Sequence, residues 1–264
     1  MEKHSKKWSL ANLPPFSVIA HRGYSDAFPE NTLAAFEGAI AAGAVMSELD
    51  VTLSRDRKVV VIHDDHLDRT TNASGLVVQH CLAELEKLDA GSWFDPKFAG
   101  ERIPSLAKVI TCAKGRHLLN IEIKSSAYAP GHPEDAIERQ VVNLIRRRRM
   151  MRSTLVSSFS RPILEQLAAM KNPPALALIS EARPSDETVD FCRRIRSFSW
   201  HPDHRMVTAE LVEEMHRHHI RVYPWTIKTA ADCQRVKAMG VDGVIVNDPH
   251  LVKGHHYENH HRAL

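Results

Sequence analysis

Residues 17–51, SVIAHRGYSDAFPENTLAAFEGAIAAGAVMSELDV, combine two strand-like runs with one helix-like stretch. Residues 17–20 and 45–51 are short apolar runs suited to buried strands, and residues 31–43 between them have the spacing of an amphipathic helix. Two parallel strands need a connection of about a dozen or more residues, usually a helix. The stretch therefore predicts a strand–helix–strand unit with parallel strands.

The same alternation continues along the chain. Further strand-like runs occupy residues 58–62, 118–123, 154–158, 175–179, 197–200, 221–227 and 242–247. Further helix-like stretches occupy residues 134–149, 161–170, 209–219 and 230–240. About eight such units predict an α/β fold of the (β/α)8 TIM-barrel type, and 264 residues is close to the usual length of one barrel. We therefore expect a single domain that spans residues 1–264.

Three parts of the chain depart from this alternation. The runs 45–51 and 58–62 are joined only by LSRDR, which is too short for a parallel crossover. Either these two runs form a hairpin, or one of them lies outside the barrel. Residues 65–117 are irregular and predict a small cap inserted after the third strand-like run, over one mouth of the barrel. The polar tail, residues 252–264, is expected to be frayed.

Composition excludes several classes of protein. Hydrophobic residues make up 43% and charged residues 25% of the chain, as in a globular protein with a sizeable core. A net charge of +3 does not favour nucleic acid and suits a small anionic substrate. The four cysteines are scattered, so neither a disulfide framework nor a zinc site is expected. No stretch approaches the roughly 18 apolar residues of a membrane span, and the expected compartment is the cytoplasm.

Ionisable residues lie in or directly after four of the strand-like runs. Burying a charge in a strand costs roughly several kcal/mol unless the charge is paired or binds a metal. A chain that repeats this arrangement is expected to hold a metal and a phosphate. The residues are His21, Arg22, Glu48, Asp50, His63, Asp64, Glu122 and Lys124.

The three carboxylates are the candidate metal ligands. Glu48 and Asp50 are two positions apart on one strand, so both point to the same face, and Glu122 with Lys124 repeats this geometry. In a barrel, side chains at the C-terminal ends of different strands meet at one mouth. Carboxylates without cysteine favour a hard cation, Mg²⁺ or Ca²⁺. The alternative for each acid alone is a buried ion pair with lysine or arginine.

His21 and His63 are the candidate acid and base, because imidazole titrates near neutral pH. The alternative for each alone is a core histidine with satisfied hydrogen bonds, and sequence does not tell which of the two is the acid. Arg22 and Lys124 suit a phosphate, the first as a bidentate fork and the second as a point charge. Asp64 is expected either to orient His63 or to cap the next turn.

Several longer motifs occur in a fixed order over residues 17–250. They are HRGYSDAFPENTLAAF, ELDVTLSRD, VVVIHDDHLDRTTNASG, GSWFDPKFAGERIPSL, NIEIK, PWTIK and GVDGVIVNDP. With these motifs the chain resembles the glycerophosphodiester phosphodiesterase family, in particular its short cytoplasmic bacterial members. Two details depart from the family pattern: the turn SRDRK lacks a glycine, and Asn247 stands where Thr or Ser is usual.

The resemblance implies a metal-dependent hydrolase that converts glycerophosphodiesters to sn-glycerol 3-phosphate and an alcohol. The three carboxylates would bind the metal, the two histidines would be the general acid and base, and Arg22 and Lys124 would hold the phosphate. The substrate's own glycerol hydroxyl would be the nucleophile and form a cyclic phosphate that water opens. Phe159 and Trp225 would pack against the glycerol carbons, with ordinary barrel core as the alternative.

Two other functions remain open from sequence. A lysophospholipase D on the same scaffold would need an apolar groove, for which the cap offers only Trp93, Phe94 and Phe98. A non-catalytic barrel that binds phosphodiesters would lack one of the site residues, and all of them are present. Sequence also leaves open the choices between Mg²⁺ and Ca²⁺ and between a monomer and a homodimer.

Overall fold

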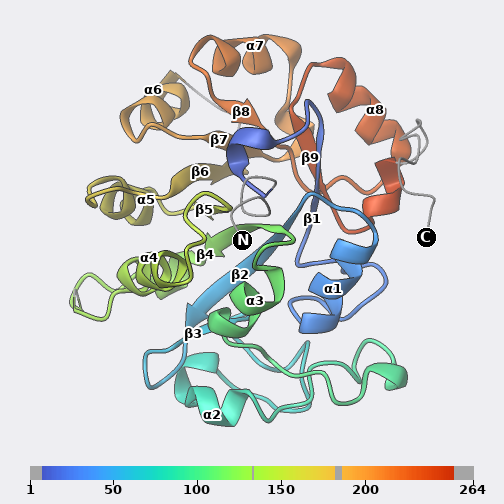
Figure 1. The fold of residues 1–264 in the computed structure, drawn as a ribbon, viewed down its shortest axis with the longest axis vertical. Coiled ribbons are helices and arrows are strands. Elements are labelled where there is room, and N and C mark those ends of the chain that lie inside the picture. The colour runs from blue at the N-terminus through green and yellow to red at the C-terminus, as the bar shows by residue number, and fades with distance from the viewer. Residues whose placement is uncertain (1–7, 133, 182–185, 253–264) are drawn as a thin grey trace.

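The computed structural model describes residues 8–132, 134–181 and 186–252, which form a barrel of parallel strands surrounded by helices (Figure 1). The barrel strands are joined in the order β8-β7-β6-β5-β4-β2-β1-β9. Their bounds are β1 Ser17–Ala20, β2 Met46–Leu53, β4 Leu118–Ile123, β5 Thr154–Ser158, β6 Ala175–Ser180, β7 Ser199–Pro202, β8 Arg221–Val222 and β9 Gly243–Val246. The predicted TIM barrel is therefore confirmed.

The barrel closes between its last strands, just beyond the end of β8. Ile227 forms a parallel bridge with Val246, and its N–H donates to the carbonyl of Ile245 at 2.9 Å. On the other side β9 pairs in parallel with β1 along its whole length. Closure matters for the site, because it brings the ends of β1 and β9 beside those of β2 and β4.

The extra strand-like run is β3, Val59–Val61, which pairs antiparallel with β2 and lies off the barrel path. Both alternatives from the sequence hold: the two runs form a hairpin, and its second arm is outside the barrel. The short turn between them leaves no residues for a crossover helix, and an antiparallel pair needs none.

The helices cover the outside of the sheet, mostly between consecutive strands (Figure 1). Several begin at a threonine or serine whose hydroxyl accepts a hydrogen bond from the first turn, such as Thr32 and Ser160. Their bounds are α1 Leu33–Ala41, α2 Leu82–Leu85, α3 Leu106–Ala113, α4 Ile137–Arg147, α5 Arg161–Ala168, α6 Asp186–Arg194, α7 Ala209–Arg217 and α8 Ala230–Ala238.

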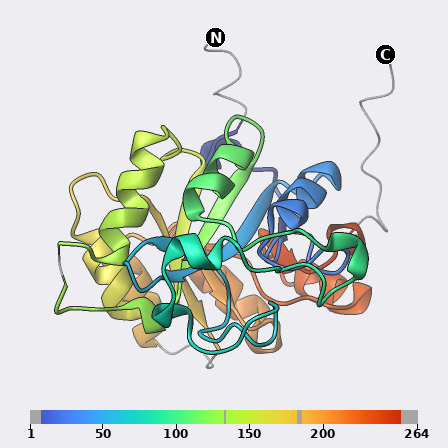
Figure 2. The same cartoon turned by 90° about the horizontal axis from the view of Figure 1, so that it is seen from below.

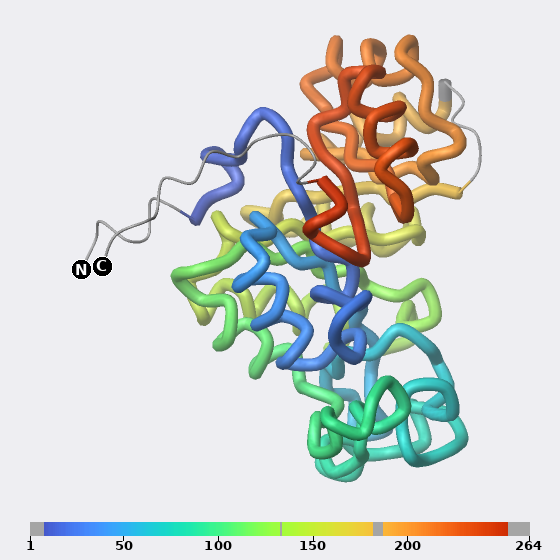
Figure 3. Tube along the Cα trace, turned by 90° about the vertical axis from the view of Figure 1, so that its right-hand side faces the viewer, coloured from blue at the N-terminus to red at the C-terminus, as the bar shows by residue number. Residues whose placement is uncertain are grey.

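Residues 62–105 project from one side of the barrel, between β3 and α3 (Figures 2 and 3). They contain α2 and the short 3-10 helices Val77–Gln79 and Pro96–Phe98, packed around a small apolar cluster of their own. The expected cap extended to residue 117, but α3 lies in the helix ring beside α1 and α4. Its apolar side chains Leu106, Val109 and Ile110 are buried in the main core, so this part belongs to the barrel.

Two layers of apolar side chains hold the barrel together. The larger layer lies between the sheet and the helices. The smaller layer fills the interior at the N-terminal end, where Leu10 from the 3-10 helix Leu10–Asn12 packs with Ile19, Met46 and Leu118. This end is therefore filled, and the opposite end, where the strands finish, remains available for a site.

Two further expectations have different outcomes. The predicted tail falls almost entirely on residues 253–264, which lie outside the described residues. Within the part of the chain that the structure describes, no helix is both long and apolar enough to cross a membrane.

Candidate active site

A cavity of about 430 Å³ lies at the C-terminal ends of the barrel strands. The site residues predicted from sequence line it except Asp64, which contacts His63, and Asp50, which is 1% exposed and lies behind Arg22 and Lys124. None of the described lining residues comes from residues 65–117, so of the segment beside the barrel only its beginning, with His63, lines the cavity. The lining residues are His21, Arg22, Glu48, His63, Asn120, Glu122, Lys124, Phe159, Ile179, Glu181, His201, Trp225 and Ile245.

The turn after β1 places His21 and Arg22 at the mouth. Arg22 has a φ of 55° and Gly23 a φ of 79°, both in the left-handed region, which a residue with a side chain adopts at a cost. At Gly23 a Cβ would come within 2.6 Å of the Ala35 backbone, so only glycine fits. In this conformation the backbone N–H of Arg22 donates to Glu48 Oε2 at 2.9 Å.

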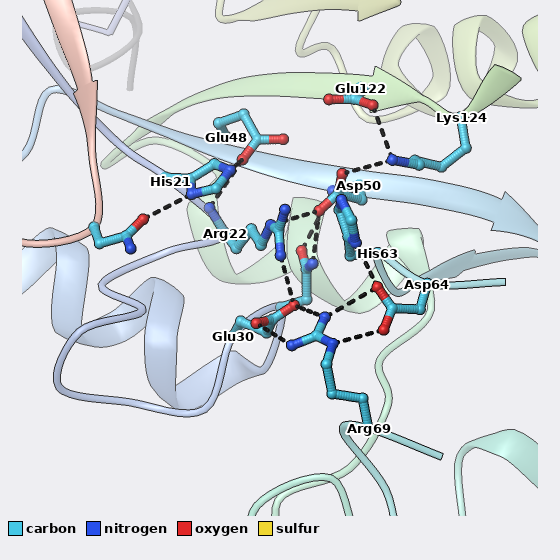
Figure 4. Close-up of polar contacts among 12 residues, drawn as sticks. His21, Arg22, Glu30, Glu48, Asp50, His63, Asp64, Arg69, Glu122 and Lys124 are labelled. Carbon is cyan, nitrogen blue, oxygen red and sulfur yellow. Dashed lines mark hydrogen bonds and ion pairs between the residues drawn. The ribbon is translucent and has the colours of Figure 1, made fainter. Parts of the chain in front are cut away.

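Glu48, Asp50 and Glu122 form a buried cluster whose carboxylate oxygens lie within 4.8 Å of one another (Figure 4). Register explains the approach, because Asp50 on β2 pairs with Glu122 on β4. Burial and the neighbouring carboxylates raise the pKa of Glu48 well above its ordinary value, and they raise that of Glu122 to about 7. Burial also opposes ionisation of Asp50, but Arg22, His63 and Lys124 outweigh it and lower its pKa.

These carboxylates fit a divalent cation. Glu48 Oε1 is buried and has no hydrogen-bond partner among the described residues, and buried Glu122 Oε1 has only the Lys124 ammonium, 3.3 Å away. Unpaired buried carboxylate oxygens are costly, and a hard cation that prefers oxygen ligands would satisfy them. It would also offset the mutual repulsion that raises the pKa of Glu48 and Glu122.

His21 is fixed by a residue from the other end of the chain. Its Nδ1 lies 2.7 Å from Asn247 Oδ1, just beyond β9, and its Nε2 lies 4.0 Å from Glu48. Burial and the Arg22 cation lower the pKa of His21 to about 4, so the ring is neutral at pH 7. Because Asn247 Oδ1 can only accept a hydrogen bond, His21 Nδ1 carries the ring proton. The lone pair of His21 Nε2 is then free to accept a proton.

His63 belongs to a chain of ion pairs that reaches Arg22 (Figure 4). His63 Nδ1 lies 2.5 Å from Asp64 Oδ1, and Asp64 accepts from Arg69 Nε at 2.6 Å. Arg69 also donates to Glu30 at 2.7 and 2.9 Å, and Glu30 accepts from Arg22 Nη1 at 2.9 Å. The hydrogen bonds from Arg69 and His63 hold the pKa of Asp64 well below its usual range. Of the two roles expected for Asp64, the contact shows the orienting one.

Lys124 and Arg22 supply the positive charge of the site. Lys124 Nζ lies 3.3 Å from Glu122 and 3.7 Å from Asp50, and Arg22 Nε lies 3.4 Å from Asp50. For both cations burial lowers the pKa, but the surrounding carboxylates outweigh it, so both remain charged. Two cations beside three carboxylates give a site that can take a metal ion and an anion together.

Phe159 and Trp225 form one apolar wall. Their rings meet edge to face with centroids 5.7 Å apart, and Trp225 Nε1 donates to the His201 carbonyl at 2.9 Å. Both side chains line the cavity and are partly exposed, so they are available to a ligand as well as packed against each other.

Sequence reasoning missed several residues of this site. Asn31, with a φ of 59°, donates to Asp50 Oδ2 at 2.8 Å, and Arg69 links Glu30 to Asp64. Neither carried a sequence signal, because each acts across the fold. Asn120 could have been found, since it precedes Glu122 by two positions and a strand points both to the same face. His201 lies on β7, far from any motif that was assigned a role.

Comparisons with known proteins agree with this geometry. The sequence model of the glycerophosphoryl diester phosphodiesterase family matches residues 21–251. The chain is 39% identical to a glycerophosphodiester phosphodiesterase of Caldanaerobacter subterraneus subsp. tengcongensis over 88% of its own length and 94% of the relative's. It is 32% identical to a glycerophosphodiester phosphodiesterase of Bacillus subtilis, over 94% and 88% of the two chains.

A solved structure shows the same fold. It is a phosphodiesterase from Oleispira antarctica in complex with the product sn-glycerol-3-phosphate, and it matches with a TM-score of 0.82 at 30% identity. The match covers 92% of this chain and 96% of that one.

Proposed function

Because this chain belongs to the glycerophosphoryl diester phosphodiesterase family, we propose that it hydrolyses glycerophosphodiesters to sn-glycerol 3-phosphate and an alcohol with the help of a divalent metal. The observation that carries the proposal is the buried cluster of Glu48, Asp50 and Glu122, in which Glu48 Oε1 has no partner among the described residues, between two histidines. Glycerophosphocholine and glycerophosphoethanolamine are suitable substrates for such a site.

Glu48, Asp50 and Glu122 would hold Mg²⁺ or Ca²⁺. When bound, the cation supplies positive charge beside the phosphoryl oxygens and so stabilises the charge that develops in the transition state. The guanidinium of Arg22 and the ammonium of Lys124 bind the phosphate from the sides of the cavity. Ion pairs with Asp50 hold both groups in place before substrate arrives, which lowers the cost of ordering them.

The tautomer of His21 supports one assignment of the two proton transfers. His21 Nε2 takes the proton of the glycerol 2-hydroxyl, whose oxygen attacks phosphorus and forms the cyclic phosphate. The bond from phosphorus to the alcohol breaks, and His63, which the Asp64 carboxylate orients, gives a proton to the departing oxygen. Water then opens the ring: His63 accepts a proton from the water, and His21 returns its proton to the 2-oxygen.

The other two candidate functions have less support. A lysophospholipase D would need an apolar groove for an acyl chain. None of the described residues that line the cavity comes from residues 65–117, which contain the apolar candidates Trp93, Phe94 and Phe98. A binding protein without catalysis would not need the orientation of both histidines by Asn247 and Asp64.

The proposal is tested with purified protein, glycerophosphocholine and either Mg²⁺ or Ca²⁺. We expect release of glycerol 3-phosphate and choline, loss of activity with EDTA, and recovery when the metal is returned. The cyclic step is tested with the analogue that carries hydrogen in place of the 2-hydroxyl. This analogue should bind without turnover, and its hydrolysis at the rate of glycerophosphocholine would rule out the substrate hydroxyl as nucleophile.

A further inference from the structure

Two buried polar residues line the cavity without a role in the mechanism above. Asn120 is 0% exposed, and neither Oδ1 nor Nδ2 has a hydrogen-bond partner among the described residues. His201 is also 0% exposed; its Nε2 pairs with Ser199 Oγ at 2.9 Å, while its Nδ1 has no partner in the described part of the chain. An unpaired buried polar group is costly, so these atoms are suited to a bound molecule.

The two residues form the inner end of the cavity, which we call the polar floor. Asn120 lies on β4 beside Glu48 of β2 and precedes Glu122 by two positions, so it is about 6–7 Å further from the mouth along the strand. His201 faces it from β7, three strands along the sheet. Below them the interior is filled by the cluster that contains Ile19 and Leu118. The polar floor is therefore a closed end.

The chemistry of the polar floor matches a hydroxyl group. A carboxamide offers both a donor and an acceptor, and an alcohol is both as well. Burial lowers the pKa of His201 to about 3, so its ring is neutral and does not attract a phosphate, which Arg22 and Lys124 bind instead. No charge in the polar floor pairs with an ammonium head group either. Uncharged hydrogen-bond donors and acceptors at a closed end of the cavity therefore suit the hydroxyl groups of the glycerol moiety.

We propose that Asn120 and His201 bind the terminal sn-1 hydroxyl of the glycerol moiety and thereby select substrates in which this hydroxyl is free. The inference rests on the proposed hydrolysis of glycerophosphodiesters and adds its specificity. The alcohol that departs points toward the open mouth, where its size is not limited. An acyl chain on the sn-1 oxygen meets the closed end, so lysophospholipids are excluded.

The test compares two substrates in the full-length protein with Mg²⁺ or Ca²⁺. One is glycerophosphocholine, and the other is 2-hydroxypropyl phosphocholine, which keeps the 2-hydroxyl and the diester but has hydrogen in place of the sn-1 hydroxyl. Choline release gives kcat/KM for each. We expect glycerophosphocholine to be preferred by at least about 10²-fold, since a site built to bond a hydroxyl rejects the analogue without it. Lysophosphatidylcholine should be a poorer substrate by at least the same factor.

The variant Asn120→Leu separates recognition from chemistry. It should lower the preference for glycerophosphocholine at least tenfold while activity on the hydroxypropyl analogue stays within about tenfold of wild type. Asn120→Ser is the second variant, for the case that the leucine does not fold. The matched control is Asn143→Leu on the exposed side of α4, which should leave both rates unchanged.

The outcomes distinguish the inference from the function on which it rests. A wild-type preference below threefold, or equal hydrolysis of lysophosphatidylcholine, overturns the polar floor and leaves the phosphodiesterase proposal intact. Equal losses on both substrates in a folded Asn120 variant overturn its role in specificity. If the wild type cleaves neither substrate with either metal, the phosphodiesterase proposal itself fails and the inference fails with it.

Discussion

Arg69 is the residue whose replacement best tests how the two halves of the site are joined. It bridges Glu30, which holds Arg22, to Asp64, which orients His63. The Arg69 side chain is 44% exposed, and an ion pair at such an exposed position contributes roughly 0.2–1 kcal/mol to stability. The substitution Arg69→Met removes two of these ion pairs. The free energy of unfolding should therefore fall by about 2 kcal/mol at most.

Activity should fall more than stability. Without Arg69, the Glu30 carboxylate retains only its bond to Arg22, and Asp64 is free to turn away from His63. Groups that orient a ligand or catalytic residue typically contribute about 10–100-fold, so kcat/KM for glycerophosphocholine should drop by that factor. The loss should appear mainly in kcat, because in the proposed mechanism His63 acts on the departing oxygen and does not bind the ground-state phosphate.

The assay needs a control from the same segment with the same exposure. Arg102 is 46% exposed and pairs with Asp89 at 3.9 Å, away from the cavity. Arg102→Met should change kcat/KM by less than threefold, and urea unfolding should give similar small losses of stability for both variants. Equal kcat/KM values for the two variants would refute the reasoning that the ion-pair chain positions His63.

Three further predictions concern acid–base chemistry, metal binding and pH. His63→Ala should lower kcat by about 10²–10⁴-fold without a change in the thermal unfolding temperature, and a loss below tenfold would remove its acid role. Glu122→Gln should abolish the rise in unfolding temperature that Mg²⁺ or Ca²⁺ causes, and in EDTA at pH 8 it should be more stable than wild type. The reason is that burial and Asp50 raise the pKa of Glu122 from 4.5 to about 7, so the metal-free fold loses stability as the pH rises from 4.5 to 7, and the full loss is present at pH 8. An unchanged metal effect would contradict the ligand assignment. Burial lowers the pKa of His117 from 6.5 to about 3, so below pH 6.5 the unfolded chain binds a proton that the folded chain does not. The free energy of unfolding should therefore fall by about 1.4 kcal/mol for each pH unit below 6.5. Urea unfolding at pH 7 and 5 should show a slope that is smaller by this amount in His117→Asn than in wild type, since His21 and His201 add the same kind of loss in both proteins.

The fold could be predicted because each unit repeats the same local pattern. Each of the nine strand-like runs overlaps a strand of the described residues, and the short turn between β2 and β3 marked the antiparallel pair of strands in this part of the chain. Two helices were missed. The stretch of α3 was assigned to the cap, because the irregular residues before it mask its periodicity, and α6 has a charged surface, including Arg193 and Arg194, with little apolar signal.

The site could be predicted only in part. Glu48, Asp50 and Glu122 were visible because a carboxylate in an apolar strand is costly and therefore marks a function. Asn247 was noted only as a departure from the family pattern, and its contact with His21 depends on closure of the barrel between β1 and β9. Arg69 and Asn120 were not assigned, because their partners are set by folding and not by neighbouring sequence.

Sequence by itself determined the α/β barrel, the charged residues at the strand ends and the family to which the chain belongs. The barrel and the charged strand ends follow from periodicity and from the cost of buried charge, and the family follows from the order of its motifs; all of these are read along the chain. The tertiary structure alone decided which atoms meet: the tautomer that Asn247 imposes on His21, the ion pairs from Arg22 to His63, and the uncharged end of the cavity at Asn120 and His201. The physical reason is that hydrogen-bond partners and closed cavities depend on distances between strands, and those distances exist only once the barrel has closed.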